Sequence, residues 1–333
     1  MSKAIDSITA SGVRDAANRL KTIIVETPLL ENADLNERVG GRVLLKAEVL
    51  QHFGSFKLRG AYNRLAQLTE NERAKGVVAW SSGNHAQGVA YAAKLLNCHS
   101  TIIMPKDAPS IKLENVKALG AEIVLYDRAR EHREEIGIKI AQERGAAIAP
   151  SFDHPQIIEG QGTLALEVFQ EASRRGVSLD GFIACCGGGG LAAGASIILN
   201  EISPATKIYL AEPEFYDEGW ISVRDGKRAY ADITKPTLCD AIATPTLGEF
   251  TLPILSKSVS GGFAVTDREV AEAMAFAFKS LKVLVEPGGA VALAAILSGK
   301  FDVSKKNVAA TLSGGNVDLH NFISIMKRHS IAI

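Results

Sequence analysis

Short apolar runs alternate along this chain with segments that have the period of an amphipathic helix. Several of the runs are apolar at every position, which is typical of strands covered on both faces. The alternation predicts an α/β fold built from βαβ units around a mostly parallel sheet. The expected strands are Gly76–Trp80, Ser100–Met104, Glu122–Tyr126, Gly181–Cys185, Lys207–Ala211 and Asn307–Leu312. The expected helices include Asn84–Leu96, Ser110–Leu119 and one after Thr266, where Thr266 and Glu269 have capping-box spacing.

The length of 333 residues predicts two domains rather than one. The first three expected strands and their helices form one compact block. After this block the chain returns to a longer unit, which we expect to include the N-terminal segment. The predicted division is a small domain of residues 53–148 and a large domain of residues 1–52 and 149–333.

The overall composition excludes several classes of partner. Thirty-seven basic and 37 acidic side chains give a net charge of zero, which argues against binding to nucleic acid or to a membrane surface. No run is apolar for long enough to span a bilayer, and the N-terminal residues predict an amphipathic helix rather than a signal peptide. The four cysteines have no CxxC spacing, so neither a zinc site nor a disulfide framework is predicted. These features are typical of a cytoplasmic enzyme with reduced thiols.

A run of four glycines separates a strand from a helix of small residues in Gly181–Gly194, which reads GFIACCGGGGLAAG. Glycines let the backbone approach an anion closely, and the following helix offers unpaired N–H groups, so the pattern predicts a phosphate site. No Lys-Ser or Lys-Thr pair follows, so this is not a Walker loop. Gly188, Gly190 and Ala193 also fit a dinucleotide fingerprint. With Glu212 as the ribose-binding acid, an NAD-dependent oxidoreductase is an alternative interpretation of this loop.

Lys57 lies between Phe56 and Leu58 in the sequence GSFKLRGA, with glycines on both sides. Such a lysine can bury its stem and keep its amine in water. Alternatively, desolvation lowers its pKa and makes it a nucleophile that condenses with a carbonyl. A phosphorylated aldehyde would use both this amine and the glycine loop, and pyridoxal phosphate is such a compound.

Three further polar motifs favour the same cofactor. Trp80–Gly88 reads WSSGNHAQG and could bind a carboxylate at a helix N-terminus, or only cap that helix. Its polar residues are Ser81, Ser82, Asn84 and His85. Ser313 in LSGGNVD could meet a ring nitrogen or cap a turn. The motif VEPGGA places Glu286 beside a proline and two glycines, ahead of an apolar run.

The motifs GSFKLRGA, SSGNHAQGVA, GQGTLALEV, the tetraglycine loop, EPGGAVALAA and LSGGNVD occur in this order. Together they resemble the serine/threonine dehydratase and serine racemase family of fold type II pyridoxal-phosphate enzymes. The resemblance spans Pro28 to Asp318. It implies a tryptophan synthase β-like fold, with two α/β domains built on open, mostly parallel twisted sheets flanked by helices. The cysteine synthase and threonine synthase branches usually have threonine in place of His85. No regulatory domain is expected after Ile333, as in the short, catabolic members.

By this resemblance Lys57 holds pyridoxal 5′-phosphate covalently, and its freed amine later takes the substrate α-proton as general base. Ser313 would hydrogen-bond the pyridine nitrogen. A neutral hydroxyl there stabilises a pyridinium less than a carboxylate does, which favours loss of a β-hydroxyl over transamination. The implied cofactor-binding residues are Phe56, Lys57, Asn84, Gly187, Gly188, Gly189, Gly190, Leu191, Glu286 and Ser313.

The implied substrate-binding residues are Ser81, Ser82, Asn84, His85 and Arg133. The first four match the family's loop for the substrate carboxylate. Ser82 also matches the serine that racemases use as the acid on the opposite face, so it joins Lys57 as an implied catalytic residue. Arg133 falls where some racemases have an arginine on a substrate loop.

The family often binds Mg²⁺, Ca²⁺ or Mn²⁺ through acids after a strand. Here the sequence AEPEFYDEG offers Glu212, the carbonyl of Tyr216 and Glu218. All-oxygen ligation suits a hard cation such as Mg²⁺. Tyrosine stands where a small residue is usual, and Glu218 where aspartate is usual. A surface loop with solvated acids is the alternative interpretation.

Two other departures from the family pattern concern the substrate. Phe152 stands where racemases have an asparagine, which favours a dehydratase. The segment Cys239–Thr251 replaces the usual ADG-type loop, with Ala241 in place of glycine. We therefore expect a substrate such as 3-hydroxyaspartate or an aryl-serine. A second substrate carboxylate would need a cation, for which Arg133 and His154 are the candidates.

The leading expectation is an ammonia-lyase that removes water from a β-hydroxy-α-amino acid such as L-threonine, L-serine or 3-hydroxyaspartate, giving a 2-oxo acid and ammonia. An amino-acid racemase using the same site is the alternative. A nicotinamide enzyme and a non-enzymatic amino-acid-binding regulator are more remote ones. The resemblance implies a homodimer with a small-molecule substrate.

Overall fold

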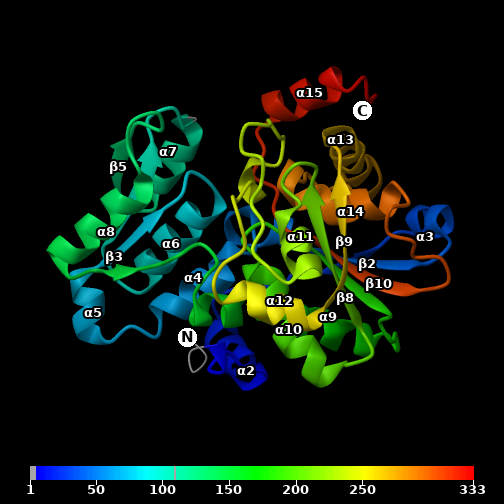
Figure 1. The fold of residues 1–333 in the computed structure, drawn as a ribbon, viewed down its shortest axis with the longest axis horizontal. Coiled ribbons are helices and arrows are strands. Elements are labelled where there is room, and N and C mark those ends of the chain that lie inside the picture. The colour runs from blue at the N-terminus through cyan, green and yellow to red at the C-terminus, as the bar shows by residue number, and fades with distance from the viewer. Residues whose placement is uncertain (1–4, 109) are drawn as a thin grey trace.

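Two separate β-sheets organise the chain, and helices flank both (Figure 1). The computed structural model describes residues 5–108 and 110–333. All but one of the strand pairs it contains are parallel. The predicted α/β architecture with mostly parallel sheets is therefore confirmed.

The larger sheet has six strands in the order β1-β2-β10-β7-β8-β9. Its strands are β1 (Leu29–Glu31), β2 (Arg42–Ala47), β7 (Gly181–Cys185), β8 (Lys207–Pro213), β9 (Val259–Val265) and β10 (Asn307–Leu312). Only the edge strand β1 runs antiparallel, against β2. Every residue of β7 is buried, as expected for a central strand covered on both faces.

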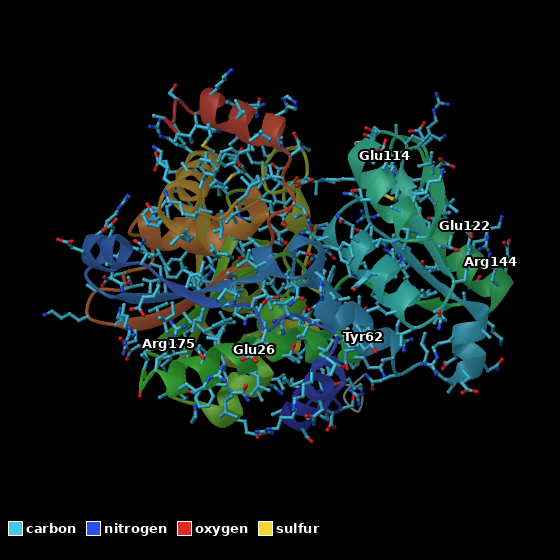
Figure 2. The ribbon with its side chains drawn as sticks, turned by 180° about the vertical axis from the view of Figure 1, so that it is seen from behind. Glu26, Tyr62, Glu114, Glu122, Arg144 and Arg175 are labelled. Carbon is cyan, nitrogen blue, oxygen red and sulfur yellow. The ribbon has the colours of Figure 1, made fainter. Side chains whose placement is uncertain are left out.

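The smaller sheet has four parallel strands in the order β5-β4-β3-β6. They are β3 (Val77–Trp80), β4 (Ser100–Pro105), β5 (Glu122–Tyr126) and β6 (Ala147–Ile148). In Figure 1 this sheet and its helices form the left part of the molecule. At its outer edge Arg144 pairs with Glu122, with Nη1 and Oε2 2.6 Å apart (Figure 2).

Helices cover both faces of the larger sheet. Those packed around it are α2 (Ala10–Leu20), α3 (Ala33–Val39), α9 (Pro155–Arg174), α10 (Gly190–Ile202), α11 (Glu218–Asp225), α12 (Thr251–Ser258), α13 (Asp267–Phe276), α14 (Pro287–Leu297) and α15 (Leu319–Arg328). In Figure 1, α13 and α14 lie above the sheet, and α9 and α10 lie below it. The predicted capping box is present: Thr266 and Glu269 bond reciprocally at the start of α13. The predicted N-terminal amphipathic helix is α2.

The smaller sheet has its own set of helices. They are α4 (Lys57–Leu65), α5 (Glu70–Lys75), α6 (Asn84–Leu95), α7 (Ser110–Ala118) and α8 (Arg133–Arg144). The helices predicted at Asn84–Leu96 and Ser110–Leu119 are α6 and α7, each one residue shorter at its end. A separate hydrophobic core under this sheet contains Ile102 and Met104, both fully buried. No helix among the described residues is long and apolar enough to cross a membrane.

Helix α4 joins the two sheets because it packs on α9 of the larger sheet and on α6 of the smaller one (Figure 1). Gly160 permits the close approach to α9, since a Cβ there would lie 2.6 Å from the carbonyl oxygen of Arg59. The Arg59 guanidinium is fully buried and bonds the carboxylates of Glu48 and Glu167 at 2.6–2.8 Å. Lys46 also pairs with Glu167, at 2.6 Å. These ion pairs fix the helix whose first residue is Lys57.

Candidate active site

A pocket lies where the carboxyl ends of β3, β7 and β10 face the start of α4. This is the edge at which open parallel sheets bind ligands. The pocket brings together all of the cofactor- and substrate-binding residues that the family resemblance implies. They are Phe56, Lys57, Ser81, Ser82, Asn84, His85, Arg133, Gly187, Gly188, Gly189, Gly190, Leu191, Glu286 and Ser313. Their individual roles are proposed below.

Lys57 is the first residue of α4 and points its amine into the pocket. Its Nζ donates a hydrogen bond to the carbonyl oxygen of Ser151, at 3.1 Å. Desolvation lowers the pKa of Lys57 to about 8. About one amine in ten is then neutral at pH 7, far more than for an exposed lysine. The group can therefore act as a nucleophile or as a base.

The tetraglycine loop forms the wall of the pocket at the start of α10. Neighbouring side-chain and backbone atoms leave no room for a Cβ on its glycines. One at Gly188 would overlap the Phe152 ring, and one at Gly187 would lie 2.7 Å from the carbonyl oxygen of Ile242. The carbonyl of Gly188 accepts a hydrogen bond from Thr251 Oγ1 at 2.7 Å. Because the peptide is planar and trans, the N–H of Gly189 points the opposite way. The loop is suited to hold an anion at a helix N-terminus.

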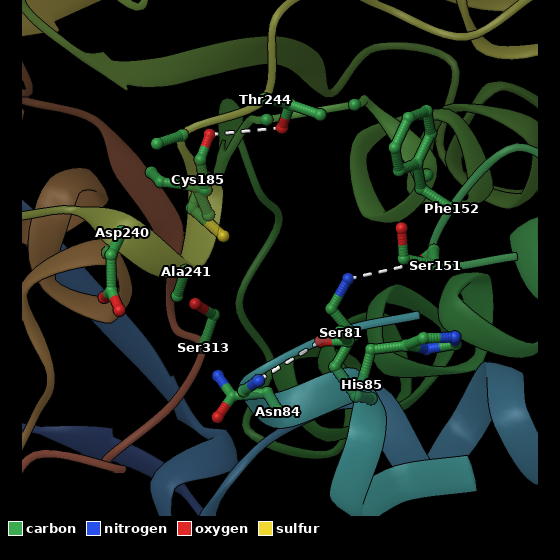
Figure 3. Close-up of a pocket in the computed structure, with 18 of the residues that line it drawn as sticks. Ser81, Asn84, His85, Ser151, Phe152, Cys185, Asp240, Ala241, Thr244 and Ser313 are labelled. Atoms are coloured by element: carbon green, nitrogen blue, oxygen red, sulfur yellow. Dashed lines mark hydrogen bonds between the residues drawn. The ribbon is translucent and has the colours of Figure 1, made fainter. Parts of the chain in front are cut away.

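Ser81, labelled in Figure 3, and Ser82 follow β3 and lead into α6. The hydroxyl of Ser81 accepts a hydrogen bond from the N–H of Gly83, at 3.2 Å. The side chain of Asn84 faces the larger sheet, where its Oδ1 accepts from Asn316 at 2.7 Å and its Nδ2 donates to Glu286 at 2.5 Å. These two bonds hold the start of α6 in place.

His85 is buried, and burial together with the charge of Lys57 lowers its pKa to about 3. The imidazole is therefore neutral. Its Nε2 lies 2.8 Å from the carbonyl oxygen of Ala149 and so carries the proton, which leaves Nδ1 as an acceptor. Nδ1 has no hydrogen-bond partner among the described residues. A carboxylate in this pocket would meet the backbone N–H groups of the helix start rather than a charged His85.

Ser313 directly follows β10, and backbone hydrogen bonds fix it on both sides. Its carbonyl accepts from the N–H of Phe56 at 3.2 Å, and its N–H donates to the carbonyl of Gly289 at 3.3 Å. Glu286 lies beside it at the N-cap of α14. Desolvation raises the pKa of Glu286 to about 7, although the bond from Asn84 opposes the shift.

The three residues proposed to bind a metal lie outside this pocket. Glu212 is fully buried at the end of β8 and accepts hydrogen bonds from the N–H groups of Gly219 and Trp220, at 3.0 and 2.8 Å. Both carboxylate oxygens of Glu218 are buried without a partner among the described residues, and desolvation raises its pKa to about 8. A surface loop with solvated acids is thus the wrong interpretation. No cluster of three or more His, Cys, Asp or Glu side chains suited to a metal occurs in the described part of the chain.

Several pocket residues were not predicted from the sequence, namely Trp80, Lys112, Ser151, Gln161, Cys185, Asp240 and Thr244. Lys112 lies in the first turns of α7, just after the carboxyl end of β4, which is a signal that could have identified it. His154, one of two cations considered for a substrate carboxylate, does not line the pocket. Desolvation lowers its pKa to about 4, and its Nδ1 accepts from the N–H of Gln156. It is therefore neutral and caps α9.

The chain is similar to several known proteins over nearly its whole length. The chain is 40% identical over 318 residues to L-threo-3-hydroxyaspartate ammonia-lyase of Saccharomyces cerevisiae, covering 96% of each chain. The solved serine racemase of Dictyostelium discoideum is 36% identical, with a TM-score of 0.88 over 94% of this chain and 100% of that one. The solved threonine deaminase of T.th. is 39% identical, with a TM-score of 0.88 over 93% of this chain and 99% of that one.

The family model for pyridoxal-phosphate-dependent enzymes matches residues 20–314. This range contains β1 to β10, the tetraglycine loop, Lys57 and Ser313. Sequence, fold and pocket thus lead to the same conclusion: the chain belongs to the pyridoxal-phosphate-dependent enzyme family.

Proposed function

We propose that this protein is a pyridoxal-phosphate-dependent ammonia-lyase that converts a β-hydroxy-α-amino acid to a 2-oxo acid and ammonia. The observation that carries the proposal is the amine of Lys57, whose pKa is about 8, in a pocket that also contains a glycine cradle for an anion. The ammonia-lyase and threonine deaminase among the relatives support the reaction type. Because the chain belongs to the pyridoxal-phosphate family, we interpret the glycine loop as a site for the phosphate of that cofactor and not for a nicotinamide dinucleotide.

The pocket fits the cofactor because two features need a partner of this kind. The loop of Gly187, Gly188, Gly189, Gly190 and Leu191 excludes side chains from a wall that faces the pocket, and it would hold the phosphate. The amine of Lys57 would hold the aldehyde carbon. Phe56, Asn84, Glu286 and Ser313 would surround the ring.

When bound, pyridoxal phosphate supplies an electron sink that stabilises negative charge on the substrate α-carbon. Lys57 takes the α-proton, because its lowered pKa leaves the amine neutral often enough to act as a base. The backbone start of α6, with Ser81, Ser82, Asn84 and His85, orients the substrate carboxylate. The β-hydroxyl then leaves with a proton as water, and hydrolysis of the remaining enamine gives the oxo acid and ammonia.

The neutral hydroxyl of Ser313 is the group suited to the ring nitrogen. It cannot stabilise a protonated ring as a carboxylate would, so charge stays near the α-carbon and expulsion of the β-hydroxyl is favoured. A Ser313→Asp variant should lose β-elimination relative to transamination. An unchanged ratio of these two products would contradict this role of Ser313.

Racemisation is the second candidate activity, and one observation favours it. The hydroxyl of Ser82 lines the pocket and makes no hydrogen bond to the described residues, so it is free to deliver a proton to the face opposite Lys57. Phe152, beside the glycine loop, favours elimination instead. Chiral analysis of the products from L-serine separates the two, since a racemase returns D-serine and little oxo acid. The Ser82→Ala variant should then lose any D-serine formed.

We also propose a Mg²⁺ site formed by Glu212, Glu218 and the carbonyl of Tyr216; Ca²⁺ or Mn²⁺ would suit the same oxygens. The unpartnered, buried carboxylate of Glu218 supports it, because a cation would supply the missing partner. Both carboxyl groups have raised pKa values through desolvation, so a metal must displace protons there. Mg²⁺ should therefore raise the melting temperature more at pH 8.5 than at pH 6.5. Glu218→Gln should abolish the shift, and the exposed Glu214→Gln should retain it.

Two further proposals concern the whole molecule. Residues 53–148 form a small domain around the four-stranded sheet, and residues 1–52 with 149–333 form the large one. The protein acts as a cytoplasmic homodimer on a small amino acid; its four free, buried cysteines are consistent with a reducing compartment.

The proposed reaction is tested by oxo-acid release from L-serine, L-threonine, L-threo-3-hydroxyaspartate and phenylserine. We expect release from at least one substrate by the parent protein loaded with pyridoxal phosphate, and none by Lys57→Ala. Turnover by Lys57→Ala at the parent rate would overturn the proposal, and so would a parent protein that acts on none of the four.

A further inference from the structure

Lys112 is a cation at the pocket that neither the cofactor nor the carboxylate loop uses. The formally cationic side chains that line the described pocket are Lys57, Lys112 and Arg133. Lys112 lies in α7 of the smaller sheet, and its Nζ pairs with Asp240 Oδ2 at 3.3 Å. Asp240 lies in the 3₁₀ turn Asp240–Ile242, within the segment that links α11 to α12 beside the larger sheet. The ion pair therefore spans the pocket from one sheet unit to the other.

The bond between Lys112 and Asp240 is easily exchanged. The Asp240 side chain is 69% exposed and the Lys112 side chain 25%, so water already solvates the carboxylate. Ion pairs of this kind contribute little to stability and break readily. The charge of Lys112 nevertheless acts inside the pocket, because it lowers the pKa of the buried Glu286 while Asp240 raises it. Lys112 is thus a weakly held cation whose field reaches the reacting region.

Lys112 lines the pocket from α7, a different element from the carboxylate loop at the start of α6 and from Lys57 at the start of α4. The carboxylate loop at the start of α6 and the amine of Lys57 define where the α-carboxylate and the α-carbon lie. Figure 3 shows Asp240 and Ala241 on the opposite side of the pocket from Phe152. Ala241 has only a methyl side chain, so this wall leaves space beside the charges of Lys112 and Asp240.

We infer that Lys112 binds a second carboxylate on the substrate, exchanging Asp240 for it, and thereby selects β-hydroxy amino acids that carry an acidic side chain. This inference rests on the proposed ammonia-lyase function. Lys112 is better placed for this than His154, which is neutral and outside the pocket. Arg133 lines the same pocket but is exposed at the start of α8 and makes no ion pair among the described residues.

The test compares kcat/KM for L-threo-3-hydroxyaspartate with that for L-serine, using protein loaded with pyridoxal phosphate. Lys112→Met keeps the length of the side chain and removes its charge. We expect it to lower the ratio of the two kcat/KM values by about tenfold to hundredfold, the range for one charge-assisted hydrogen bond, mainly through KM for the diacid. Lys112→Arg should retain most of the ratio. Lys117→Met, which removes an exposed charge from the same helix, should leave the ratio unchanged.

Asp240 provides an independent check, since it competes with the substrate for Lys112 and repels its second carboxylate. Asp240→Asn should raise the ratio in the parent protein and should raise it less when Lys112→Met is also present, because only the direct repulsion by Asp240 is then removed. An unchanged ratio in Lys112→Met, or equal losses on both substrates, would overturn the inference. A parent protein that acts on L-serine but not on the diacid would also overturn it, while the ammonia-lyase proposal would stand. Failure on these two substrates with activity on L-threonine or phenylserine would overturn the inference alone, and failure on all four substrates would overturn both proposals.

Discussion

Asn84 donates a hydrogen bond from Nδ2 to the buried carboxylate of Glu286, with 2.5 Å between Nδ2 and Oε1. Asn84 begins α6 of the smaller sheet, and Glu286 caps α14 of the larger one. Asn316 donates to the other end of the same amide, at 2.7 Å. The carboxylate loop and the wall around Ser313 are therefore joined by one amide group at the bottom of the pocket.

Replacing Asn84 by alanine should destabilise the protein in a pH-dependent way. The folded pKa of Glu286 is raised to about 7 from 4.5, so its ionised form costs stability as the pH rises from 4.5 through 7. Without Asn84 the carboxylate lacks its donor and the pKa rises further. The free energy of unfolding should fall by about 1–3 kcal/mol at pH 8, and by less at pH 5, where Glu286 is protonated.

Urea unfolding at the two pH values measures this effect. The matched control is Asn200→Ala, which removes an exposed amide that donates to Ser258 Oγ at 2.8 Å. It should change the unfolding free energy by less than about 0.5 kcal/mol at either pH. An equal loss at pH 5 and pH 8 for Asn84→Ala would contradict the assigned ionisation of Glu286.

Arg59→Met should be among the most destabilising single substitutions in the chain. It removes the cation from between the carboxylates of Glu48 and Glu167, and Glu48 is fully buried. Breaking a buried pair in this way costs about 3–5 kcal/mol. Arg130→Met, whose side chain is 85% exposed, is the control and should unfold like the parent. A loss below about 1 kcal/mol for Arg59→Met, by urea unfolding, would show that the ion pairs do not hold α4.

Gly188→Ala should weaken cofactor binding because the added methyl would overlap the Phe152 ring. Either the ring or the loop must move, which displaces the N–H groups that face the pocket. We expect the dissociation constant for pyridoxal phosphate to rise at least tenfold, measured by fluorescence titration. Adding Phe152→Ala should recover part of the affinity by making room. If Gly188→Ala alone binds as the parent does, the loop does not form the phosphate cradle.

Local patterns were sufficient to predict the strand, the glycine loop and the start of the helix in Gly181–Gly194, because strand burial and helix start are both encoded within a few residues. The same holds for the Thr266 capping box. Strands β1 and β6 were missed because they have only three and two residues, and strand β2, Arg42–Ala47, was not predicted either. Strand β9 was missed because Gly261 and Gly262 interrupt its apolar pattern.

The pocket could be predicted as a set of motifs but not as a geometry. The contacts of Lys57 with Ser151 and of Lys112 with Asp240 join residues far apart in the sequence, and no local pattern encodes them. The burial of Arg59 is another case, since its partners Glu48 and Glu167 lie in other elements. Asp240 lies in a long segment without regular strands, where periodicity carries no signal.

The central claim, that Lys57 is the group to which the cofactor is attached, can be measured directly. The protein loaded with pyridoxal phosphate is reduced with borohydride and digested, and the peptides are analysed by mass spectrometry. We predict a pyridoxyl phosphate group on Lys57, with loss of the visible absorbance, and no label in Lys57→Ala. A label confined to another lysine, or an active protein with no label at all, would contradict this account.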